Sequence, residues 1–239
     1  MAMSKRCIPY TPCFRELKET TFALVTTAGV HLRDQEPFDL AGDNSWRLIP
    51  GDVETRQLMV THEHYDHRDA DQDINVVFPI DRLRELAAEG IIGGVSDKHL
   101  GFMGYTQQFR DLYERAAPEI ARIISRSQAD GVVLTAGCPL CHRVSAITQR
   151  EIEMTGIPTV LITVAPEQSR QAGPPRAIAP HHFKMGNSLG GPRQNDLQRK
   201  VLLDALRRWE AREEPGHTWE ITYPAYDSSD WQPIDLQEG

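Results

Sequence analysis

The sequence predicts an α/β fold with a mostly parallel sheet and helices on both faces, the three-layer arrangement of Rossmann-like and flavodoxin-like proteins. Three observations support this class. Short apolar runs such as 21–26 and 131–135 alternate with segments whose apolar residues recur at helical spacing. Strands that alternate with helices build parallel βαβ units. Unusual polar residues also come directly after the predicted strands, where parallel sheets bind their ligands.

The predicted strands are short runs rich in apolar and β-branched residues, and the predicted helices repeat apolar residues every three to four positions. The strands are expected at 21–26, 57–61, 91–95, 131–135 and 157–163, with a short extended piece at 45–49. The helices are expected at 80–89, 107–127, 142–155 and 196–213. Gly90 ends the first helix and Pro118 interrupts the second. The segments 37–54, 71–78 and 164–192 are expected to be loops.

These elements predict a simple domain organisation. Residues 1–20 form an irregular N-terminal arm, 21–213 a single α/β catalytic domain, and 214–239 an irregular C-terminal tail. A chain of 239 residues is long enough to bury a substantial core without disulfides or metals.

Composition excludes several classes of function. The net charge of −8 argues against a nucleic-acid partner, because binding a phosphate backbone needs a concentrated basic face. No apolar run is long enough to span a membrane, and the N-terminus lacks the apolar core of a signal peptide. We therefore expect a cytoplasmic protein, with no membrane partner, that forms a homo-oligomer and acts on a small molecule.

The chain contains a Cys-x-x-Cys pair, Cys138 and Cys141, between a predicted strand and a predicted helix. Four cysteines are too few for a disulfide scaffold, and a close pair in a reducing compartment is more often catalytic or metal-binding. At a helix start, backbone N–H groups and the helix dipole favour a thiolate. The pair could attack a substrate and then form a disulfide, it could supply two ligands to zinc, or it could be two buried small residues.

A second motif, His62-Glu-His-Tyr-Asp-His67, offers three imidazoles and two carboxylates. In an extended backbone His62 and His64 point the same way and could chelate one metal, with Asp66 or His67 as a further ligand alongside Cys138 and Cys141. His67 and Glu63 are candidates for acid–base catalysis. The alternative is a polar loop whose histidines bond to the backbone.

Further candidates lie on the same expected edge of the sheet. His142 follows Cys141 directly and is a candidate acid–base group, while His99 follows the predicted strand 91–95. The candidate substrate-binding residues are His31, Arg33, Arg143 and Thr135. Arg176 is another potential carboxylate clamp, although most arginines are simply solvated. The glycine-rich segment 186–191 is expected to be a tight turn lining the site.

Several of these segments together resemble a known family. They are Ala23-Leu-Val-Thr-Thr-Ala-Gly-Val-His31, Thr61-His-Glu-His-Tyr-Asp-His-Arg-Asp-Ala-Asp71, Asp73-Ile-Asn-Val-Val-Phe-Pro-Ile80, Gly137-Cys-Pro-Leu-Cys-His-Arg-Val144 and Thr148-Gln-Arg-Glu-Ile-Glu-Met-Thr-Gly-Ile-Pro158. Over roughly residues 8–192 the chain resembles the selenoprotein B family of the glycine, sarcosine, betaine and D-proline reductases, most closely its D-proline branch.

The resemblance implies roles for the cysteines. Cys141 stands at the selenocysteine position, which makes the chain a cysteine-containing variant, and Cys138 is its resolving partner. The family further implies reductive cleavage of a carbon–nitrogen bond, a separate pyruvoyl-bearing partner subunit and a dithiol electron donor. A thiol is mostly protonated near neutral pH where a selenol is ionised, so Cys141 needs help from its helix terminus or a histidine.

Three functions follow from these observations. The first is a thiol-dependent reductase that cleaves a carbon–nitrogen or carbon–sulfur bond in a small amino-acid-derived or heterocyclic substrate. The second is a zinc-dependent desulfhydrase or hydrolase that releases sulfide from a thioamide or thiohydantoin-like molecule. The third is a non-catalytic subunit of a reductase complex.

Overall fold

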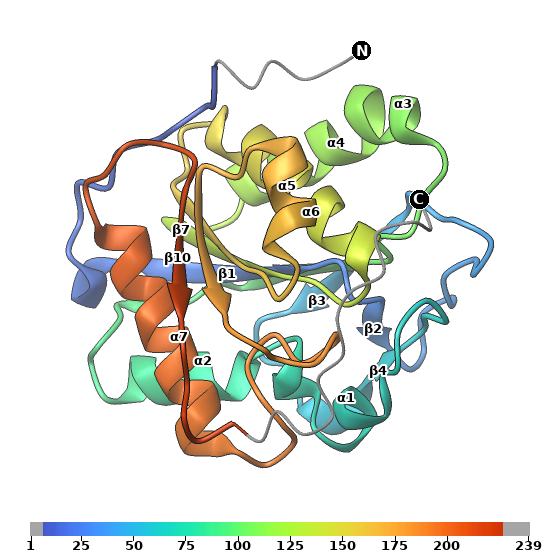
Figure 1. Cartoon of the computed structure of the whole chain (residues 1–239), viewed down its shortest axis with the longest axis horizontal. Coiled ribbons are helices and arrows are strands. Elements are labelled where there is room, and N and C mark those ends of the chain that lie inside the picture. The colour runs from blue at the N-terminus through green and yellow to red at the C-terminus, as the bar shows by residue number, and fades with distance from the viewer. Residues whose placement is uncertain (1–6, 227–239) are drawn as a thin grey trace.

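The structure is a computed structural model that describes residues 7–226, and its centre is an eight-stranded sheet (Figure 1). The strand order is β10-β9-β8-β7-β1-β6-β3, with the short β5 beside β1. Every pair is parallel except β3 with β6. The predicted α/β class with a mostly parallel sheet is confirmed.

The strands that form this sheet are short. They are β1 (Thr21–Thr26), β3 (Trp46–Pro50), β5 (Gly94–Val95), β6 (Lys98–Phe102), β7 (Gly131–Thr135), β8 (Thr159–Ile162), β9 (Arg176–Pro180) and β10 (His217–Ile221). The extended piece predicted at 45–49 is confirmed as β3, which pairs antiparallel with β6 at the edge of the sheet.

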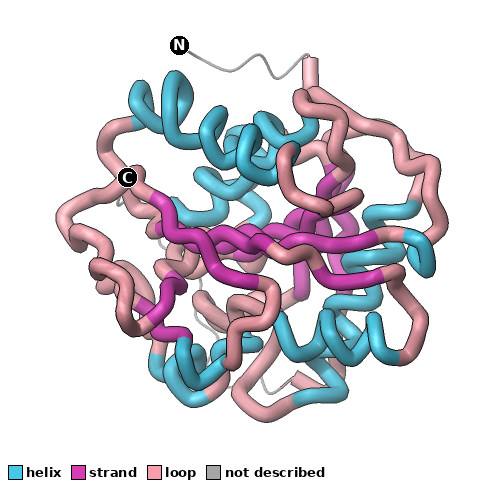
Figure 2. Tube along the Cα trace, turned by 180° about the vertical axis from the view of Figure 1, so that it is seen from behind, coloured by secondary structure: helices cyan, strands magenta, loops and turns pink. Residues whose placement is uncertain are grey.

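Helices cover both faces of the sheet (Figure 1). One face carries α3 (Phe109–Asp111), the π-helix η4 (Leu112–Ala116), α4 (Ala117–Ser125), α5 (Pro139–Glu153) and α6 (Pro166–Ala172). The other face carries α2 (Ile80–Ala88) and α7 (Asn195–Glu210). Figure 2 shows the sheet between these two helical layers. Within the described range, the structure contains no helix long and apolar enough to cross a membrane.

The alternation of side chains along β1 explains why both faces are covered. Phe22 and Leu24 belong to the core on the α2–α7 side, whereas Ala23 and Val25 belong to the core on the α4–α5 side. All four are buried. Because neighbouring residues of a strand point to opposite faces, an uninterrupted apolar run needs a helical layer on each side.

A separate small sheet lies beside the main one and corrects one expectation. β2 (Val30–Leu32) pairs antiparallel with β4 (Leu58–Val60). The strand predicted at 57–61 therefore exists but does not join the parallel sheet. Apolar patterning identifies a strand, but its pairing partner depends on tertiary contacts.

Other differences concern segments with weak patterns. The strand predicted at 91–95 is only β5, and the main strand is β6, so His99 lies inside a strand rather than after one. The predicted loop 71–78 contains the end of α1 (Arg68–Gln72) and the 3-10 helix η3 (Ile74–Val76). The predicted loop 164–192 contains α6 and β9. Proline and polar residues in these segments interrupt the apolar periodicity that predicts helices and strands, so the sequence pattern did not indicate these elements. Contacts with neighbouring elements stabilise them instead.

The helix predicted at 107–127 is present as α3, η4 and α4 in succession. Pro118 lies at the start of α4, directly after the π-helical turn, so the expected interruption is a change of helix type rather than a break. Proline has no N–H to donate, and a first helical turn does not need one.

The predicted N-terminal arm and C-terminal tail each contain a regular element. Residues 217–221 of the predicted tail form β10, which is parallel to β9, so that part of the tail is not irregular. Residues 17–19 of the predicted arm form the 3-10 helix η1 (Leu17–Glu19). Residues 1–6 and 227–239 lie outside the described residues, and the boundaries of the catalytic domain stay a prediction.

Candidate active site at the switch point of the sheet

The candidate site lies where the two middle strands β1 and β7 end. These strands are neighbours, and the chain leaves β1 toward α2 on one face but leaves β7 into α5 on the other (Figure 1). Such a reversal opens a crevice at the carboxyl ends of the strands, where ligands bind in open α/β sheets. Thr27 and Ala28 follow β1, and Cys138 follows β7, so the sequence motifs meet at this point.

The start of α5 places the two cysteines. Cys138 is the N-cap residue, with extended backbone angles, and its sulfur accepts a hydrogen bond from the backbone N–H of Cys141 at 3.2 Å. Pro139 occupies the first turn, where its fixed φ suits a helix start. The helix predicted from residue 142 therefore begins at Pro139, and the Cys-x-x-Cys spacing is the geometry of a helix cap.

His62 joins the cysteine pair from the loop after β4. The Cys138 and Cys141 sulfurs lie 2.6 Å apart, and His62 Nε2 lies 3.1 Å from Cys141 Sγ. All three side chains are buried, with 3% of His62 and none of Cys141 exposed. His62 and Cys141 are 79 positions apart in the sequence, and the fold brings them into contact.

The backbone fixes which nitrogen of His62 carries the proton. His62 Nδ1 accepts the backbone N–H of His64 at 3.0 Å. A neutral imidazole whose Nδ1 accepts must carry its hydrogen on Nε2. His62 therefore donates its Nε2–H to Cys141 Sγ and acts as a hydrogen-bond donor to a thiolate rather than as a base.

The two sulfurs have opposite electrostatics. Burial raises the pKa of the Cys141 thiol, but the hydrogen bond with Cys138, followed by the electrostatic interaction and the hydrogen bond with His62, outweighs it and holds the pKa well below its ordinary range. Burial, followed by the interaction with Cys141, raises the pKa of Cys138 well above its ordinary range. Cys141 is thus the more acidic of the two thiols, and Cys138 the less acidic.

Two residues at the site were not predicted from the sequence. Thr27 Oγ1 donates to the backbone carbonyl of Cys141 at 3.1 Å and contacts Ser145 Oγ at 2.8 Å. Tyr65 lies against the His62 ring and donates its hydroxyl hydrogen to Ala28 O at 2.9 Å. Their positions gave a weak signal, since Thr27 directly follows the first strand run and Tyr65 lies inside the histidine motif.

The other members of the histidine motif point elsewhere. His64 stacks on Tyr105, with ring centroids 3.4 Å apart, and Glu63 is exposed. Asp66 bonds to Arg68 and Lys184, and His67 Nδ1 lies 2.8 Å from an Asp71 carboxylate oxygen. His64, Asp66 and His67 are therefore not in the group that could hold a metal.

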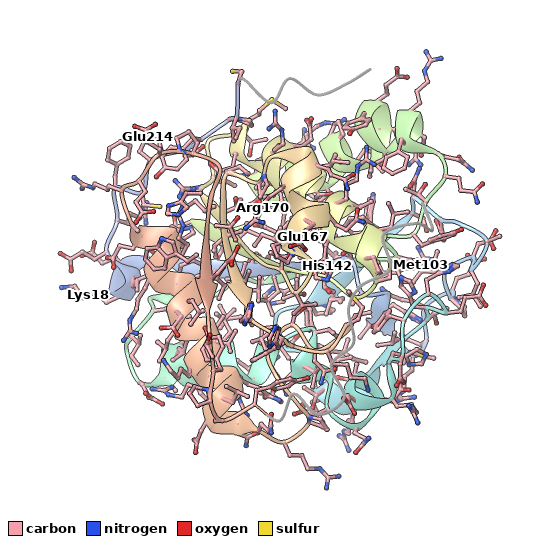
Figure 3. The ribbon with its side chains drawn as sticks, in the orientation of Figure 1. Lys18, Met103, His142, Glu167, Arg170 and Glu214 are labelled. Carbon is pink, nitrogen blue, oxygen red and sulfur yellow. The ribbon has the colours of Figure 1, made fainter. Side chains whose placement is uncertain are left out.

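The predicted site residues on β7 and α5 other than Cys141 contact groups other than the two sulfurs. His142 is fully buried in the interior (Figure 3), and its Nδ1 contacts Thr163 Oγ1 at 3.0 Å rather than a sulfur. Burial lowers its pKa to about 3, so it is neutral. Thr135 Oγ1 bonds to Thr26 and to Val77 O. The Arg143 guanidinium lies over the Phe109 ring, 4.8 Å from its centroid.

The remaining candidates lie outside the sulfur cluster. His31 is buried in β2 and contacts Leu32 O and Thr61 Oγ1. Arg33 donates to Arg56 O at an exposed position. His99 Nδ1 accepts the backbone N–H of Leu24 inside the sheet. Arg176 is a structural residue, because it is buried in a 2.6 Å ion pair with Glu153.

The three buried residues could in principle bind a metal. Ligand atoms of His62, Cys138 and Cys141 lie within 4.8 Å of one another, and within 7–226 no other His, Cys, Asp or Glu joins them. Two thiolates on a tetrahedral zinc lie about 3.8 Å apart, given Zn–S bonds of about 2.3 Å. The 2.6 Å separation is shorter, so the cysteines would have to move apart to hold zinc.

Fold and site together define an α/β protein with a buried, activated cysteine pair at its switch point. Residues 1–137 match the family model for glycine/sarcosine/betaine reductase selenoprotein B. The chain is 45% identical over 199 residues to D-proline reductase subunit gamma of Acetoanaerobium sticklandii, covering 83% of this chain and 82% of the relative. The chain therefore belongs to the selenoprotein B family, as its motifs indicated.

More distant relatives are longer. Glycine reductase complex component B subunit gamma of Carboxydothermus hydrogenoformans is 30% identical over 210 residues, covering 84% of this chain but 48% of the relative. Betaine reductase complex component B subunit beta of Peptoclostridium acidaminophilum is 31% identical over 151 residues, 61% of this chain and 34% of the relative. The chain spans about half or less of these two proteins. No solved structure matches the chain.

The names of these relatives support an oxidoreductase-family role as a component of a reductase complex. The family match ends at residue 137, so the two cysteines lie just beyond it.

Proposed function

We propose that this chain is the thiol-bearing catalytic subunit of a reductase complex that cleaves a carbon–nitrogen bond in a small amino acid. Cys141 is the nucleophile and Cys138 is the resolving thiol. The observation that supports this is the arrangement at Cys141 Sγ, which accepts hydrogen bonds from both Cys138 and His62. A buried thiolate needs such donors in order to exist near neutral pH without selenium.

The proposed reaction has two steps. The Cys141 thiolate attacks the carbon that carries the nitrogen, so that a carbon–sulfur bond forms while the carbon–nitrogen bond breaks and the nitrogen takes a proton. Cys138 then attacks the Cys141 sulfur, a disulfide forms, and the electron pair of the carbon–sulfur bond passes to the carbon, which is protonated. The substrate is reduced by two electrons and the cysteine pair is oxidised. A dithiol donor then restores the pair.

His62 keeps its proton through this cycle. Its Nδ1 is occupied by the His64 N–H, so giving up the Nε2 hydrogen would leave an imidazolate. Its proposed role is to stabilise the thiolate before attack and again when the disulfide is reduced. The Cys138 thiol, whose pKa is raised, carries a proton that is released as the disulfide forms.

D-proline is the proposed substrate, because the relative with 45% identity is a D-proline reductase subunit. A pyruvoyl-bearing partner subunit and a dithiol donor are proposed from the family. Arg143 is the proposed contact for the substrate carboxylate. Its Nε is buried and has no hydrogen-bond partner among residues 7–226.

Turnover with thiol mapping tests this proposal. The reduced chain, reconstituted with its partner subunit, is incubated with D-proline without a dithiol donor, and cysteines are mapped by mass spectrometry. We expect one Cys138–Cys141 disulfide per substrate reduced, with Cys7 and Cys13 unchanged. Turnover that continues in a variant lacking both Cys138 and Cys141 would contradict the proposal.

A zinc-dependent hydrolase remains the second candidate, because three ligand atoms lie close together. Metal analysis of the purified chain separates the two functions. Stoichiometric zinc that is lost in Cys138→Ala, with sulfide or amine release that needs no reductant, would favour hydrolysis. A metal-free chain that reduces substrate favours the thiol mechanism.

A further inference from the structure

Tyr65 is a buried aromatic residue whose place the proposed chemistry does not explain. It lies three residues after His62, in the loop that follows β4. Its ring meets the His62 ring edge-on, with centroids 4.9 Å apart and an interplanar angle of 69°. Tyr65 therefore forms one wall of the space in which His62 reaches Cys141.

Three separate segments hold the Tyr65 ring in place. Its hydroxyl donates to Ala28 O, in the loop after β1, at 2.9 Å. Gly137 and Gly186 have no side chain where the ring lies, and a Cβ at either position would come closer than 3.0 Å to ring atoms. Gly186 also has a φ of 83°, which favours glycine. The ring is thus fixed between the loops that follow β1, β7 and β9.

The loop that carries Gly186 is itself anchored to the histidine motif. Lys184 Nζ lies 3.1 Å from Asp66 Oδ2, and Asn187 Nδ2 donates to Asp69 Oδ2 at 3.0 Å. Ser188 Oγ donates to Ala136 O at 2.9 Å, next to the cysteine loop. These bonds connect the loop that carries Gly186 to the histidine motif and to the loop before the cysteines.

His62 needs such a wall. Its imidazole is held at its edge by the His64 N–H and the Cys141 sulfur. The ring can still turn about its side-chain bonds, and an N–H···S hydrogen bond that departs from linearity weakens steeply. A rigid aromatic ring against the imidazole removes this freedom.

Tyr65 is not itself a proton donor or acceptor in the reaction. Burial, followed by the charges of Cys141 and Cys138, raises the pKa of its hydroxyl well above the ordinary range. The hydroxyl stays protonated and bonded to Ala28 O. Its contribution has to come from the position of its ring.

We propose that Tyr65 is a positioning residue that holds the His62 Nε2–H in line with Cys141 Sγ and so maintains the Cys141 thiolate. The inference rests on the role proposed for His62. It assigns the conformations of Gly137 and Gly186 to the same task, because both glycines leave room for the Tyr65 ring.

The test measures the pH midpoint of Cys141 alkylation. The full chain is reduced and treated with iodoacetamide at a series of pH values, and Cys141 modification is quantified by mass spectrometry with the exposed Cys7 as the internal reference. Burial slows alkylation of Cys141 at every pH, so the midpoint and not the absolute rate reports the thiolate. We expect Tyr65→Leu to raise the midpoint by about one pH unit, a tenfold loss of thiolate.

Tyr65→Phe is the matched control, because it keeps the ring and removes only the bond to Ala28. We expect its midpoint to stay close to that of the unmodified chain. A Tyr65→Phe shift as large as that of Tyr65→Leu would overturn the proposal, since the hydroxyl and not the ring would then be responsible.

A double-mutant cycle shows whether Tyr65 acts through His62. We expect His62→Ala to raise the midpoint more than Tyr65→Leu, and the double variant to match His62→Ala alone. Additive shifts, or no shift in Tyr65→Leu, would refute the positioning role while leaving the proposed function intact. An unchanged midpoint in His62→Ala would instead refute the role proposed for His62.

A folding control accompanies each variant, because Tyr65 is a core residue. Circular dichroism and thermal unfolding establish that the native state is populated. If Tyr65→Leu does not fold, Tyr65→Met is used, since a flexible side chain of similar volume fills the space without a rigid ring. The same upward shift supports the proposal, and a midpoint equal to that of Tyr65→Phe overturns it.

Discussion

Cys141 and Cys13 are two largely buried thiols whose environments have opposite effects. The Cys141 sulfur accepts hydrogen bonds from Cys138 and His62, and its pKa lies well below the ordinary range. The Cys13 sulfur donates to the backbone carbonyl Trp209 O at 2.9 Å, and burial raises its pKa to about 12. The surroundings therefore lower the pKa of one thiol and raise the pKa of the other.

Open space alone would select the wrong cysteine. A hollow of about 700 Å³ lies beside Cys13, lined also by Tyr10, Phe14 and His217. Cys141 is fully buried. The hollow is next to a protonated thiol that is a hydrogen-bond donor, so we assign the chemistry to the buried pair.

The largest expected effect on turnover comes from replacing Cys141, and the matching replacement of Cys13 is its control. Cys141→Ser should abolish substrate reduction by the reconstituted complex, because an alcohol at this site is neither ionised nor able to form a disulfide. Cys13→Ser should leave turnover unchanged. Steady-state rates for the two variants check the comparison, and equal losses in both would break it.

His62 variants should have the next largest effect on turnover. His62→Ala removes the donor to Cys141, and we expect the rate near neutral pH to fall by roughly tenfold to a hundredfold, in line with thiol pKa shifts of one to two units. His62→Gln is the matched control, because its side-chain amide can still donate to the sulfur. Recovery of most of the rate in His62→Gln, measured across pH, would confirm that donation matters. Full activity in His62→Ala would contradict it.

Burial also affects the pKa of histidines, and through it the pH dependence of stability. His142 on α5 is one example. Burial lowers the pKa of His142, and of His99 in β6, to about 3. In the unfolded chain a histidine takes up a proton near pH 6.5, so the unfolded state binds more protons below that pH. The free energy of unfolding should therefore fall as pH drops from about 6.5 toward 3, by about 1.4 kcal/mol per pH unit for each histidine.

Urea denaturation between pH 7 and pH 5 measures this loss. In His142→Gln the contribution of this histidine is absent, so the slope of unfolding free energy against pH should be smaller than that of the unmodified chain by about 1.4 kcal/mol per pH unit. An unchanged slope would mean that His142 is protonated in the folded state.

The smallest expected effect concerns Cys13 itself. Cys13→Ala removes the hydrogen bond to Trp209 O and some packing, and we expect a loss of about 1 kcal/mol in the free energy of unfolding. Chemical denaturation with turnover as a parallel readout tests this. A change in turnover without a change in stability would give Cys13 a role that its surroundings do not suggest.

The sequence predicted the parallel sheet because β1, β7 and β8 are uninterrupted apolar runs, and uninterrupted runs need cover on both faces. It missed β9 and β10, whose Pro, Arg and polar residues do not form a strand pattern. These two strands are fixed by pairing with β8 and with each other. Strand formation at this end of the sheet therefore depends on pairing with an adjacent strand rather than on the local sequence pattern.

The part of the candidate site that depends on local spacing was predicted from the sequence, and the part that depends on distant contacts was not. Cys138 and Cys141 were identified because their spacing is local, and a helix start keeps local spacing intact. His62 was selected only as one of several neighbouring histidines, and His142 was expected to assist because it is adjacent in sequence. Adjacent helical residues point in different directions, so His142 faces Thr163 while Cys141 faces His62.

The sequence by itself determined the fold class, the cysteine pair and the family to which the chain belongs. Only the tertiary structure decided which of the two sulfurs is the more acidic and which histidine contacts it. The reason is that a pKa depends on donors within a few ångströms, and these come from segments far apart in the chain. His62 and its Tyr65 wall reach Cys141 only because β1 and β7 lie side by side.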